Sequence, residues 1–177
     1  MPDATVSALE ARLRMVEDRL EIYNLIASHP PSADTGADYY TRAIYLEDGA
    51  VDFGGGKAAS GNEAVAAIGR TPEHQAAIAG GLAHFAGLPH ISIDGDRAVV
   101  VSNLQILTPH PTAEPVAVPG HGTSRGYRVH RVGANRWELE RTAQGWKIRR
   151  RTLRPLDGSE PARELLRTAL KAYEPAR

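Results

Sequence analysis

The sequence predicts an α+β fold in which helices come first along the chain and an antiparallel sheet follows. In the first part, apolar residues recur at steps of three and four, which is the period of an amphipathic helix. After Gly80-Gly81, long β-rich runs are joined by short turns, and Asp94-Gly95-Asp96 is a strong hairpin signal. A helical half followed by hairpin-connected strands is typical of helices packed on one face of a single sheet.

Length and composition favour one domain over residues 1–177. The chain is 42% hydrophobic and 24% charged, and no apolar run approaches the roughly 18 residues of a membrane span. Its 21 Lys and Arg balance 21 Asp and Glu, which argues against nucleic acid or a membrane as a partner. Cysteine is absent, and the amino terminus lacks the basic segment and apolar core of a secretion signal. We therefore expect a cytoplasmic protein without disulfides.

The first helix is expected from Val6 to about Ser28, with one apolar stripe buried against the sheet or another copy of the chain. The stripe consists of Leu9, Leu13, Val16, Leu20, Tyr23 and Ile26. Pro30-Pro31 is expected to end this helix, and residues 32–36 to form a turn before a second helix from Asp38 to Tyr45. Asp34 lies in that turn, and functional residues are common at such junctions.

Short elements are expected between these helices and Gly81. In chain order they are a turn at 47–49, a strand at 50–53, a glycine turn at 54–56, a helix at 62–68 and a helix from 72 to 79 that begins at Thr71-Pro72-Glu73. The first part of the chain is therefore mainly helical.

The second part is expected to be a run of strands and one closing helix. The strands are placed at 82–93, 97–108, 123–140 and 146–153, and the carboxy-terminal helix at about 159–172. Four prolines in the segment 109–122 exclude a central strand there and indicate a long loop at a sheet edge. Residues 132–135 permit two interpretations, a hairpin turn or part of a continuous strand. A continuous strand would place Asn135 and Trp137 on one inward face.

His84 is the clearest functional candidate, because it interrupts an apolar, strand-like run from Leu82 to Ile91. Histidine has an ordinary pKa of about 6.5 and exchanges protons near neutral pH. Next to an orienting carboxylate, such a residue serves as a general base. Residue type alone leaves open a structural role for His84 in the core or at a sheet edge, and a turn-forming role for Asp34.

The chain resembles the SnoaL-like and scytalone dehydratase-like branch of the nuclear transport factor 2-like superfamily. The resemblance covers roughly residues 6–156 and rests on the order of several short motifs. These are Tyr23 to Ile26, Asp34-Thr35-Gly36, Leu46 to Phe53, His84-Phe85-Ala86-Gly87, Ile93 to Ala98 and Gly145 to Ile148. It implies a cone-shaped barrel, in which a strongly curved antiparallel sheet wraps around the amino-terminal helices and encloses a cavity.

The resemblance also implies roles for individual residues. Asp34 and His84 match a catalytic His-Asp pair, His110 matches a second catalytic histidine, and Asn135 matches a substrate-binding asparagine. In that scheme His84 removes a proton next to a carbonyl, Asp34 orients its ring, His110 protonates the departing hydroxyl and Asn135 donates to an enolate oxygen. Three departures argue against the same substrate: Gly133 stands where the dehydratase has serine, and Ala33 and Phe53 stand where it has tyrosines.

Further candidates complete the expected site. Phe53, Tyr23 and Trp137 are expected to bind substrate together with Asn135. His84, His90 and His110 lack an acidic residue placed to complete a metal site, so neither a metal nor another cofactor is expected. The run Arg149-Arg150-Arg151 is expected to be solvated or ion-paired.

These observations predict a cofactor-independent lyase or isomerase, dehydratase-like in chemistry, that acts on a small hydrophobic molecule of the polyketide, steroid or aromatic type. A SnoaL-like polyketide cyclase is an alternative because it uses similar acid–base chemistry. A noncatalytic scaffold or ligand-binding subunit, similar to dioxygenase small subunits, is another. In each case we expect a homo-oligomer, a dimer or a trimer.

Overall fold

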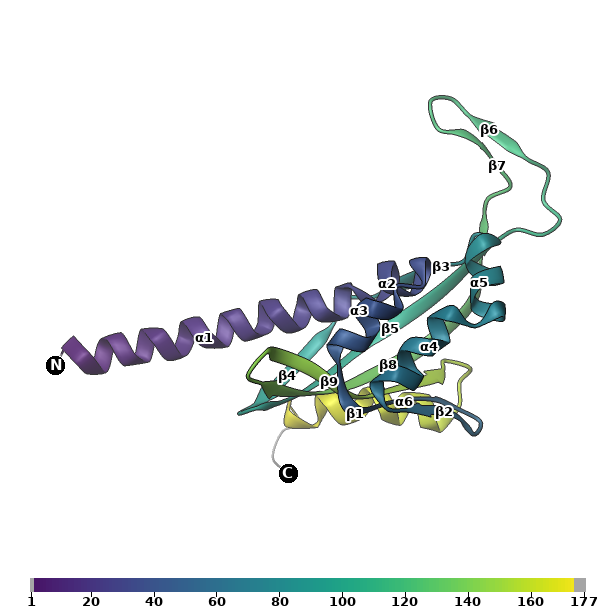
Figure 1. The fold of residues 1–177 in the computed structure, drawn as a ribbon. Helices are drawn as coiled ribbons and strands as arrows, with labels where there is room; N and C mark the ends of the chain where they lie inside the picture. The colour runs from purple at the N-terminus through teal and green to yellow at the C-terminus, as the bar shows by residue number, and fades with distance from the viewer. Residues whose placement is uncertain (1, 174–177) are drawn as a thin grey trace.

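The chain folds as helices followed by a sheet, as the computed structural model of residues 2–173 shows (Figure 1). The first helices are α1 (Pro2–Ala27), α2 (His29–Thr35), α3 (Asp38–Ile44), α4 (Asn62–Ala67) and α5 (Pro72–Ala79), with the 3-10 turn η1 (Ile68–Arg70) between the last two. The main strands are β1 (Tyr45–Gly54), β2 (Lys57–Ser60), β3 (Ala83–Ala86), β4 (His90–Asp94), β5 (Arg97–Pro109), β8 (Tyr127–Thr142) and β9 (Gly145–Pro155). The described chain closes with α6 (Glu160–Arg167) and η2 (Thr168–Tyr173).

These main strands form one seven-stranded sheet in the order β2-β1-β9-β8-β5-β3, with β4 also paired to β5. All pairs are antiparallel except β1 and β9, which run parallel. Figure 1 shows α6 on the other side of the sheet from α2, α3 and α4. The predicted α+β class and curved sheet are confirmed, with this one parallel pair as the difference.

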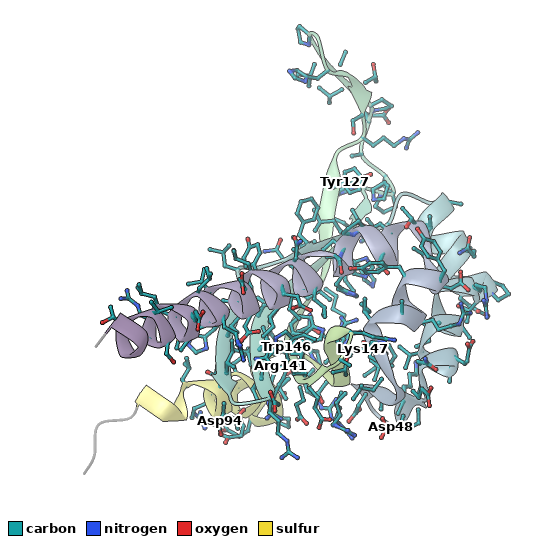
Figure 2. The ribbon with its side chains drawn as sticks, turned by 60° about the vertical axis from the view of Figure 1, so that its left-hand side comes forward. Asp48, Asp94, Tyr127, Arg141, Trp146 and Lys147 are labelled. Atoms are coloured by element: carbon teal, nitrogen blue, oxygen red, sulfur yellow. The ribbon has the colours of Figure 1, made fainter. Side chains whose placement is uncertain are left out.

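The first helix is confirmed, but its packed face differs from the prediction. Asp18, Ile22 and Ile26 are buried toward the sheet, whereas the predicted apolar stripe is 44% to 64% exposed over most of its length. Asp18 fixes this orientation, because it accepts hydrogen bonds from Arg141 and from Nε1 of Trp146 (3.1 Å), which lie beneath α1 in Figure 2. The stripe is therefore not buried against the sheet, apart from Ile26.

Several predicted boundaries need correction. Residues 32–35, including Asp34, are part of the helix α2 and do not form the expected turn; Pro30-Pro31 lie in the first turn of this helix, where proline is tolerated. Residues 47–49 belong to β1 and are not a turn, and residues 82–93 form two strands, β3 and β4, instead of one. The expected loop 109–122 contains β6 (Val116–Val118), which pairs with β7 (Gly122–Ser124) in a hairpin that stands away from the sheet (Figure 1).

The continuous interpretation of residues 132–135 is confirmed, because β8 runs without a break from Tyr127 to Thr142. Gly133 is required by close packing: a Cβ there would lie 2.8 Å from Cδ1 of Leu153 on β9. The register between β8 and β9 shifts at Arg149, where a bulge follows the Leu139–Ile148 pair. A bulge reverses the alternation of faces along its strand, and the candidate site depends on this one.

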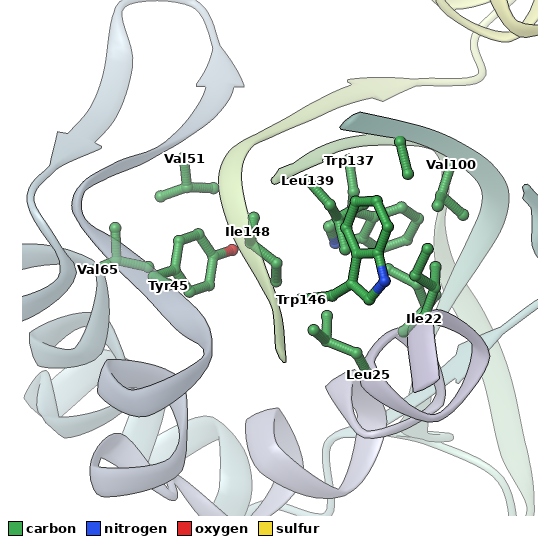
Figure 3. Close-up of a cluster of buried hydrophobic side chains, with 12 residues drawn as sticks. Ile22, Leu25, Tyr45, Val51, Val65, Val100, Trp137, Leu139, Trp146 and Ile148 are labelled. Carbon is green, nitrogen blue, oxygen red and sulfur yellow. The ribbon is translucent and has the colours of Figure 1, made fainter. Parts of the chain in front are cut away.

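The core lies between α1, α3 and the inner face of the sheet (Figure 3). Trp137 is 1% exposed and Ile22 is fully buried, and Trp146 and Tyr45 join the same cluster. Burial of large aromatic side chains contributes strongly to stability. Within residues 2–173, no helix combines the length and apolar character needed to cross a bilayer.

Candidate active site

A cavity of about 210 Å³ lies between the helices and the inner face of the sheet. Most of its wall is apolar and comes from Leu25, Ile44, Val51, Phe53, Val65, Ile68, Leu104, Ile106, Trp137, Ile148 and Leu153. The polar groups in the wall are His29, Ser32, Thr41, Tyr45, His74, His84, Arg131 and Arg151. An apolar enclosure with a few convergent polar groups is the usual form of a small-molecule site.

Helix α2 and strand β3 bring Asp34 and His84 together from positions fifty residues apart. Gly36 ends α2 in the left-handed conformation (φ 64°), and a Cβ at this position would lie 2.9 Å from the carbonyl oxygen of Gly69. His74 on α5 also holds α2 in place, since its Nε2 lies 2.8 Å from the carbonyl oxygen of Ala33. The glycine turn and this cross-link fix the segment that carries Asp34.

Asp34 and His84 make three hydrogen bonds. Nδ1 of His84 lies 2.6 Å from Oδ1 of Asp34, and the backbone N–H of His84 donates to Oδ1 (3.1 Å) and Oδ2 (2.9 Å). With Nδ1 donating to the carboxylate, Nε2 is the ring nitrogen that can accept a proton. The His84 side chain is 9% exposed and that of Asp34 is 26% exposed.

Burial lowers the pKa of His84 below its ordinary value of 6.5, although the hydrogen bond and the negative charge of Asp34 act in the opposite direction. Arg151 and His74 lower this pKa further by charge repulsion. The ring is therefore neutral at neutral pH, which is the form a general base needs.

Arg151 is a buried cation at the back of the cavity and is 6% exposed. Its Nε donates to Oδ1 of Asn135 (3.1 Å), its guanidinium lies near the hydroxyl of Tyr45, and its carbon Cζ lies 5.6 Å from the Trp137 ring centre. Among residues 5–170, whose side chains the structure describes, no carboxylate lies within ion-pair distance of it. Burial lowers the pKa of this guanidinium, yet arginine remains charged in proteins.

His29 connects Arg151 with His84. Its Nδ1 lies 3.4 Å from Nη1 of Arg151, and its ring meets that of His84 edge to face at a centroid distance of 5.5 Å. Burial lowers the pKa of His29 well below 6.5, so this ring is neutral as well. Its Nε2 is buried without a partner among the described residues and is available as a donor.

The charged side chains in the wall of the cavity are all basic. Arg131 and Arg151 belong to it, whereas none of its lining residues is acidic. Asp34 supplies negative charge only from behind the His84 ring. Such a site is suited to stabilise negative charge on a bound molecule.

The structure brings some of the predicted site residues together. His84, Phe53 and Trp137 line the cavity, and Asp34 lies directly behind His84. Asn135 is fully buried beneath Arg151 and is not part of the wall. Asn135 therefore supports Arg151 and does not itself contact the cavity.

Two predicted site residues lie elsewhere. Tyr23 is 44% exposed on the outer face of α1, since the packed face of that helix differs from the predicted one. His110 follows β5, and its Nδ1 accepts a hydrogen bond from the backbone N–H of Ala113 (3.1 Å) at the base of the projecting hairpin. Neither lines the cavity, so the expected roles in substrate binding and proton donation are not supported by these positions.

Sequence reasoning missed Arg151 and His29. Arg149 and Arg150 are ion-paired with Glu140 and Asp52 as expected, but the bulge at Arg149 turns Arg151 into the core. Strict alternation from the buried Ile148 would place Arg151 on the opposite, outer face of the strand. The burial of Arg151 can be predicted only together with the bulge. A site role for His29 could not be predicted, because Pro30-Pro31 indicates the end of a helix and His29 in fact begins α2.

No group of three or more His, Asp or Glu side chains within the part of the chain that the structure describes is arranged to hold a metal ion.

Comparison with known proteins gives a consistent assignment. The family model of the SnoaL-like domain matches residues 14–152. The structure of an NTF2-like protein with a cystatin-like fold from Novosphingobium aromaticivorans is 37% identical, covers 90% of this chain and 96% of its own, and has a TM-score of 0.79. Among curated protein sequences, none matches this chain.

Two more distant structures share the fold. A protein of unknown function from Mycobacterium tuberculosis is 19% identical, with 92% of this chain and 91% of that chain covered and a TM-score of 0.65. A hexachlorocyclohexane dehydrochlorinase from Novosphingobium barchaimii is 15% identical, with 84% and 96% covered and a TM-score of 0.62. At these identities the likeness concerns the fold alone.

Proposed function

The chain belongs to the SnoaL-like domain family, and from this premise we propose that it is a lyase or isomerase in which His84 removes a proton next to a carbonyl group of a small apolar molecule. Asp34 orients the base, and Arg151 stabilises the negative charge that develops on the carbonyl oxygen. The acid–base chemistry comes from protein side chains.

The observation that carries this proposal is the 2.6 Å contact between Nδ1 of His84 and Oδ1 of Asp34 beside an apolar cavity. A carboxylate in this position fixes the tautomer of the ring and stabilises the imidazolium that forms during proton transfer. A scaffold without a catalytic role has no need for a neutral histidine that is held in this way. The geometry therefore favours an enzyme over the noncatalytic alternative.

In the first step, Nε2 of His84 takes the proton from the carbon next to the substrate carbonyl. The electron pair of the broken C–H bond moves toward the carbonyl oxygen and gives an enolate, while His84 becomes an imidazolium paired with Asp34. General-base catalysis of this kind contributes about 10²- to 10⁴-fold in rate.

The enolate oxygen is stabilised by donors at the back of the cavity. Arg151 has five N–H donors, and its bonds to Asn135 and His29 leave donor capacity for a ligand. Electrostatic stabilisation is strong in a site from which water is excluded, because no solvent has to reorganise.

The second step decides the reaction class. Loss of a β-hydroxyl, protonated by the His84 imidazolium, gives an alkene and water; return of the proton at another carbon gives an isomer. Attack of the enolate on a second carbonyl carbon would give a cyclised product. The three outcomes share the first step, so a test of that step does not depend on the choice among them.

The cavity volume limits the size of the substrate. About 210 Å³ is below the roughly 300–1,000 Å³ of sites for drug-sized ligands. We therefore favour an oxygenated molecule of one or two rings, of the aromatic or small polyketide type, over a four-ring steroid.

The experiment is a screen of hydroxylated cyclic ketones in D₂O, followed by ¹H NMR. The wild-type protein is expected to exchange the α-proton of at least one compound and to release water where a β-hydroxyl is present. Asp34→Asn and His84→Ala are expected to show both signals at strongly reduced rates while circular dichroism remains unchanged. His121→Ala is the matched control, because His121 is exposed on the projecting hairpin. Loss of exchange in the control as well, or exchange at the wild-type rate in His84→Ala, would count against the proposal.

A further inference from the structure

One face of α1 is apolar and uncovered. Leu13 lies nine residues before Ile22, about two and a half helical turns, so the two side chains point to opposite sides. Ile22 is fully buried against the body of the protein, while Leu13 is 58% exposed and Leu20 is 64% exposed. Figure 1 shows that the amino-terminal part of α1 stands clear of every other element.

The exposed residues follow a heptad pattern. They occupy the first and fourth positions of three successive seven-residue repeats, namely Val6 and Leu9, Leu13 and Val16, and Leu20 and Tyr23. All of these side chains are 44% to 64% exposed. When apolar residues follow one another at alternating steps of three and four residues, they form a seam on one side of the helix. This is the pattern of a coiled coil.

Opposite charges flank the two sides of this seam. Glu10 and Glu17 occupy the fifth heptad position on one side, and Arg12 and Arg19 occupy the seventh position on the other. When two such helices lie parallel and in register, the seventh position of one faces the fifth position of the next repeat in the other. Arg12 would then face the partner subunit's Glu17, twice by symmetry, whereas antiparallel helices would bring equal charges together.

We propose that α1 pairs with α1 of a second copy of this chain in a parallel, two-stranded coiled coil. The exposed apolar seam, its heptad spacing and the complementary charges point to the same partner and the same orientation. Arg12 and Glu17 form no ion pair with another described side chain, so both are available for this contact. The proposal does not depend on the reaction, because the seam lies on the side of α1 opposite the packed face.

The part of the molecule that needs a partner is the exposed amino-terminal part of α1. A helix gains most of its stability in proteins from packing of an apolar face, and residues 5–17 of α1 are exposed. The body contacts α1 through the face of Asp18 and Ile22, which leaves the opposite side free for a second helix. The predicted homo-oligomer thus takes the form of a dimer held by α1.

The first test is the mass of the protein in solution, measured by light scattering after size exclusion. The wild-type protein is expected to be a dimer, and Leu13→Glu is expected to weaken dimerisation at least tenfold while the α-proton exchange activity and the fold of the body remain. Met15→Glu is the matched control, because Met15 is 55% exposed on α1 but lies outside the seam. A monomeric wild-type protein, a mass of three or more chains, or a fully dimeric Leu13→Glu would overturn the proposal.

The second test establishes orientation. The chain contains no cysteine, so a single introduced thiol reports only on its own position in the partner. Leu9→Cys is expected to form a disulfide between copies under mild oxidation, because equal seam positions meet in a parallel coiled coil. Ser7→Cys, which points away from the seam, is expected not to. Crosslinking of both or of neither would contradict the parallel arrangement.

Exchange of the charges gives a third readout. Arg12→Glu and Glu17→Arg are each expected to dimerise more weakly than the wild-type protein, since each places equal charges opposite one another. A mixture of the two variants is expected to form mixed dimers in preference to either homodimer, because all facing pairs are then attractive. A random mixture would show that Arg12 and Glu17 do not face one another.

Discussion

Nε of Arg151 donates a hydrogen bond to Oδ1 of Asn135 across 3.1 Å, in a part of the core where no described carboxylate is within ion-pair distance of the guanidinium. A buried cation without a counter-ion lowers the stability of a fold, unless hydrogen bonds or a bound ligand compensate for its lost hydration. In the proposed mechanism Arg151 therefore has two separable roles, since it stabilises the enolate and lowers the stability of the fold.

Replacement of Arg151 separates these roles in an experiment. Arg151→Met is expected to keep or increase the free energy of unfolding, because an apolar side chain of similar length replaces an unpaired buried charge. The rate of α-proton exchange is expected to fall about 10²- to 10³-fold, the usual effect of removing one stabilising donor. Arg150→Met is the control, because Arg150 is exposed and paired with Asp52. A variant at 151 that keeps the wild-type rate would remove Arg151 from the mechanism.

The pH dependence of the reaction follows from the state of His84. Burial lowers the pKa of His84 below 6.5, and only the neutral ring acts as a base. The value of kcat/KM is therefore expected to rise with pH through a single ionisation below 6.5 and to be level at higher pH. Asp34 raises this pKa, so in Asp34→Asn the rising limb is expected to move to lower pH and the level rate to fall. A pH–rate profile from about pH 5 to pH 8 checks both, and a limb at higher pH in Asp34→Asn would contradict the assignment.

The stability of the protein is expected to depend on the same buried histidines. His29 and His84 have pKa values below 6.5 in the folded protein, so the unfolded chain binds more protons as the pH falls. Stability from this source is fully present above about pH 6.5 and is lost as the pH falls below it. Urea denaturation at several pH values is expected to show this loss, with a smaller slope in His29→Gln and an unchanged slope in His121→Gln. Equal slopes in all three proteins would contradict the burial of a neutral His29.

The contact between α1 and the sheet is expected to depend on Asp18. This carboxylate is 7% exposed and bonds to Arg141 and Trp146, so Asp18→Ala leaves buried donors without an acceptor. A loss of about 3 kcal/mol in the free energy of unfolding is expected. Glu160→Ala, which breaks exposed pairs with Arg163 and Arg167, is expected to lose much less, because exposed ion pairs contribute little to stability. Equal losses in the two variants, measured in urea, would argue against a packed α1.

Local patterns in the sequence were sufficient for most of the fold. The helix period predicted α1, Thr71-Pro72 predicted the start of α5, where the Thr71 hydroxyl accepts from the His74 backbone N–H, and Asp94-Gly95-Asp96 predicted the turn between β4 and β5. These signals depend on a few neighbouring residues. The pairing of Asp34 with His84 was expected from a resemblance, and the structure places the two side chains in contact.

What could not be predicted depends on contacts between distant segments. The packed face of α1 is chosen by the Asp18–Arg141 contact, which no periodicity reveals. The inward position of Arg151 depends on a bulge at Arg149, and Asn135 lies beneath that guanidinium instead of in the cavity wall. Each case arises from tertiary packing that overrides a local pattern.

The central claim is that His84 is the base of a proton transfer, and the rate of α-proton exchange in His84→Ala tests it most directly. With a compound that the wild-type protein exchanges, this variant is expected to be slower by about 10²- to 10⁴-fold. Added imidazole is expected to restore part of the rate by entering the space that the side chain leaves. A folded His84→Ala protein that exchanges the same proton at the wild-type rate without imidazole would contradict the claim.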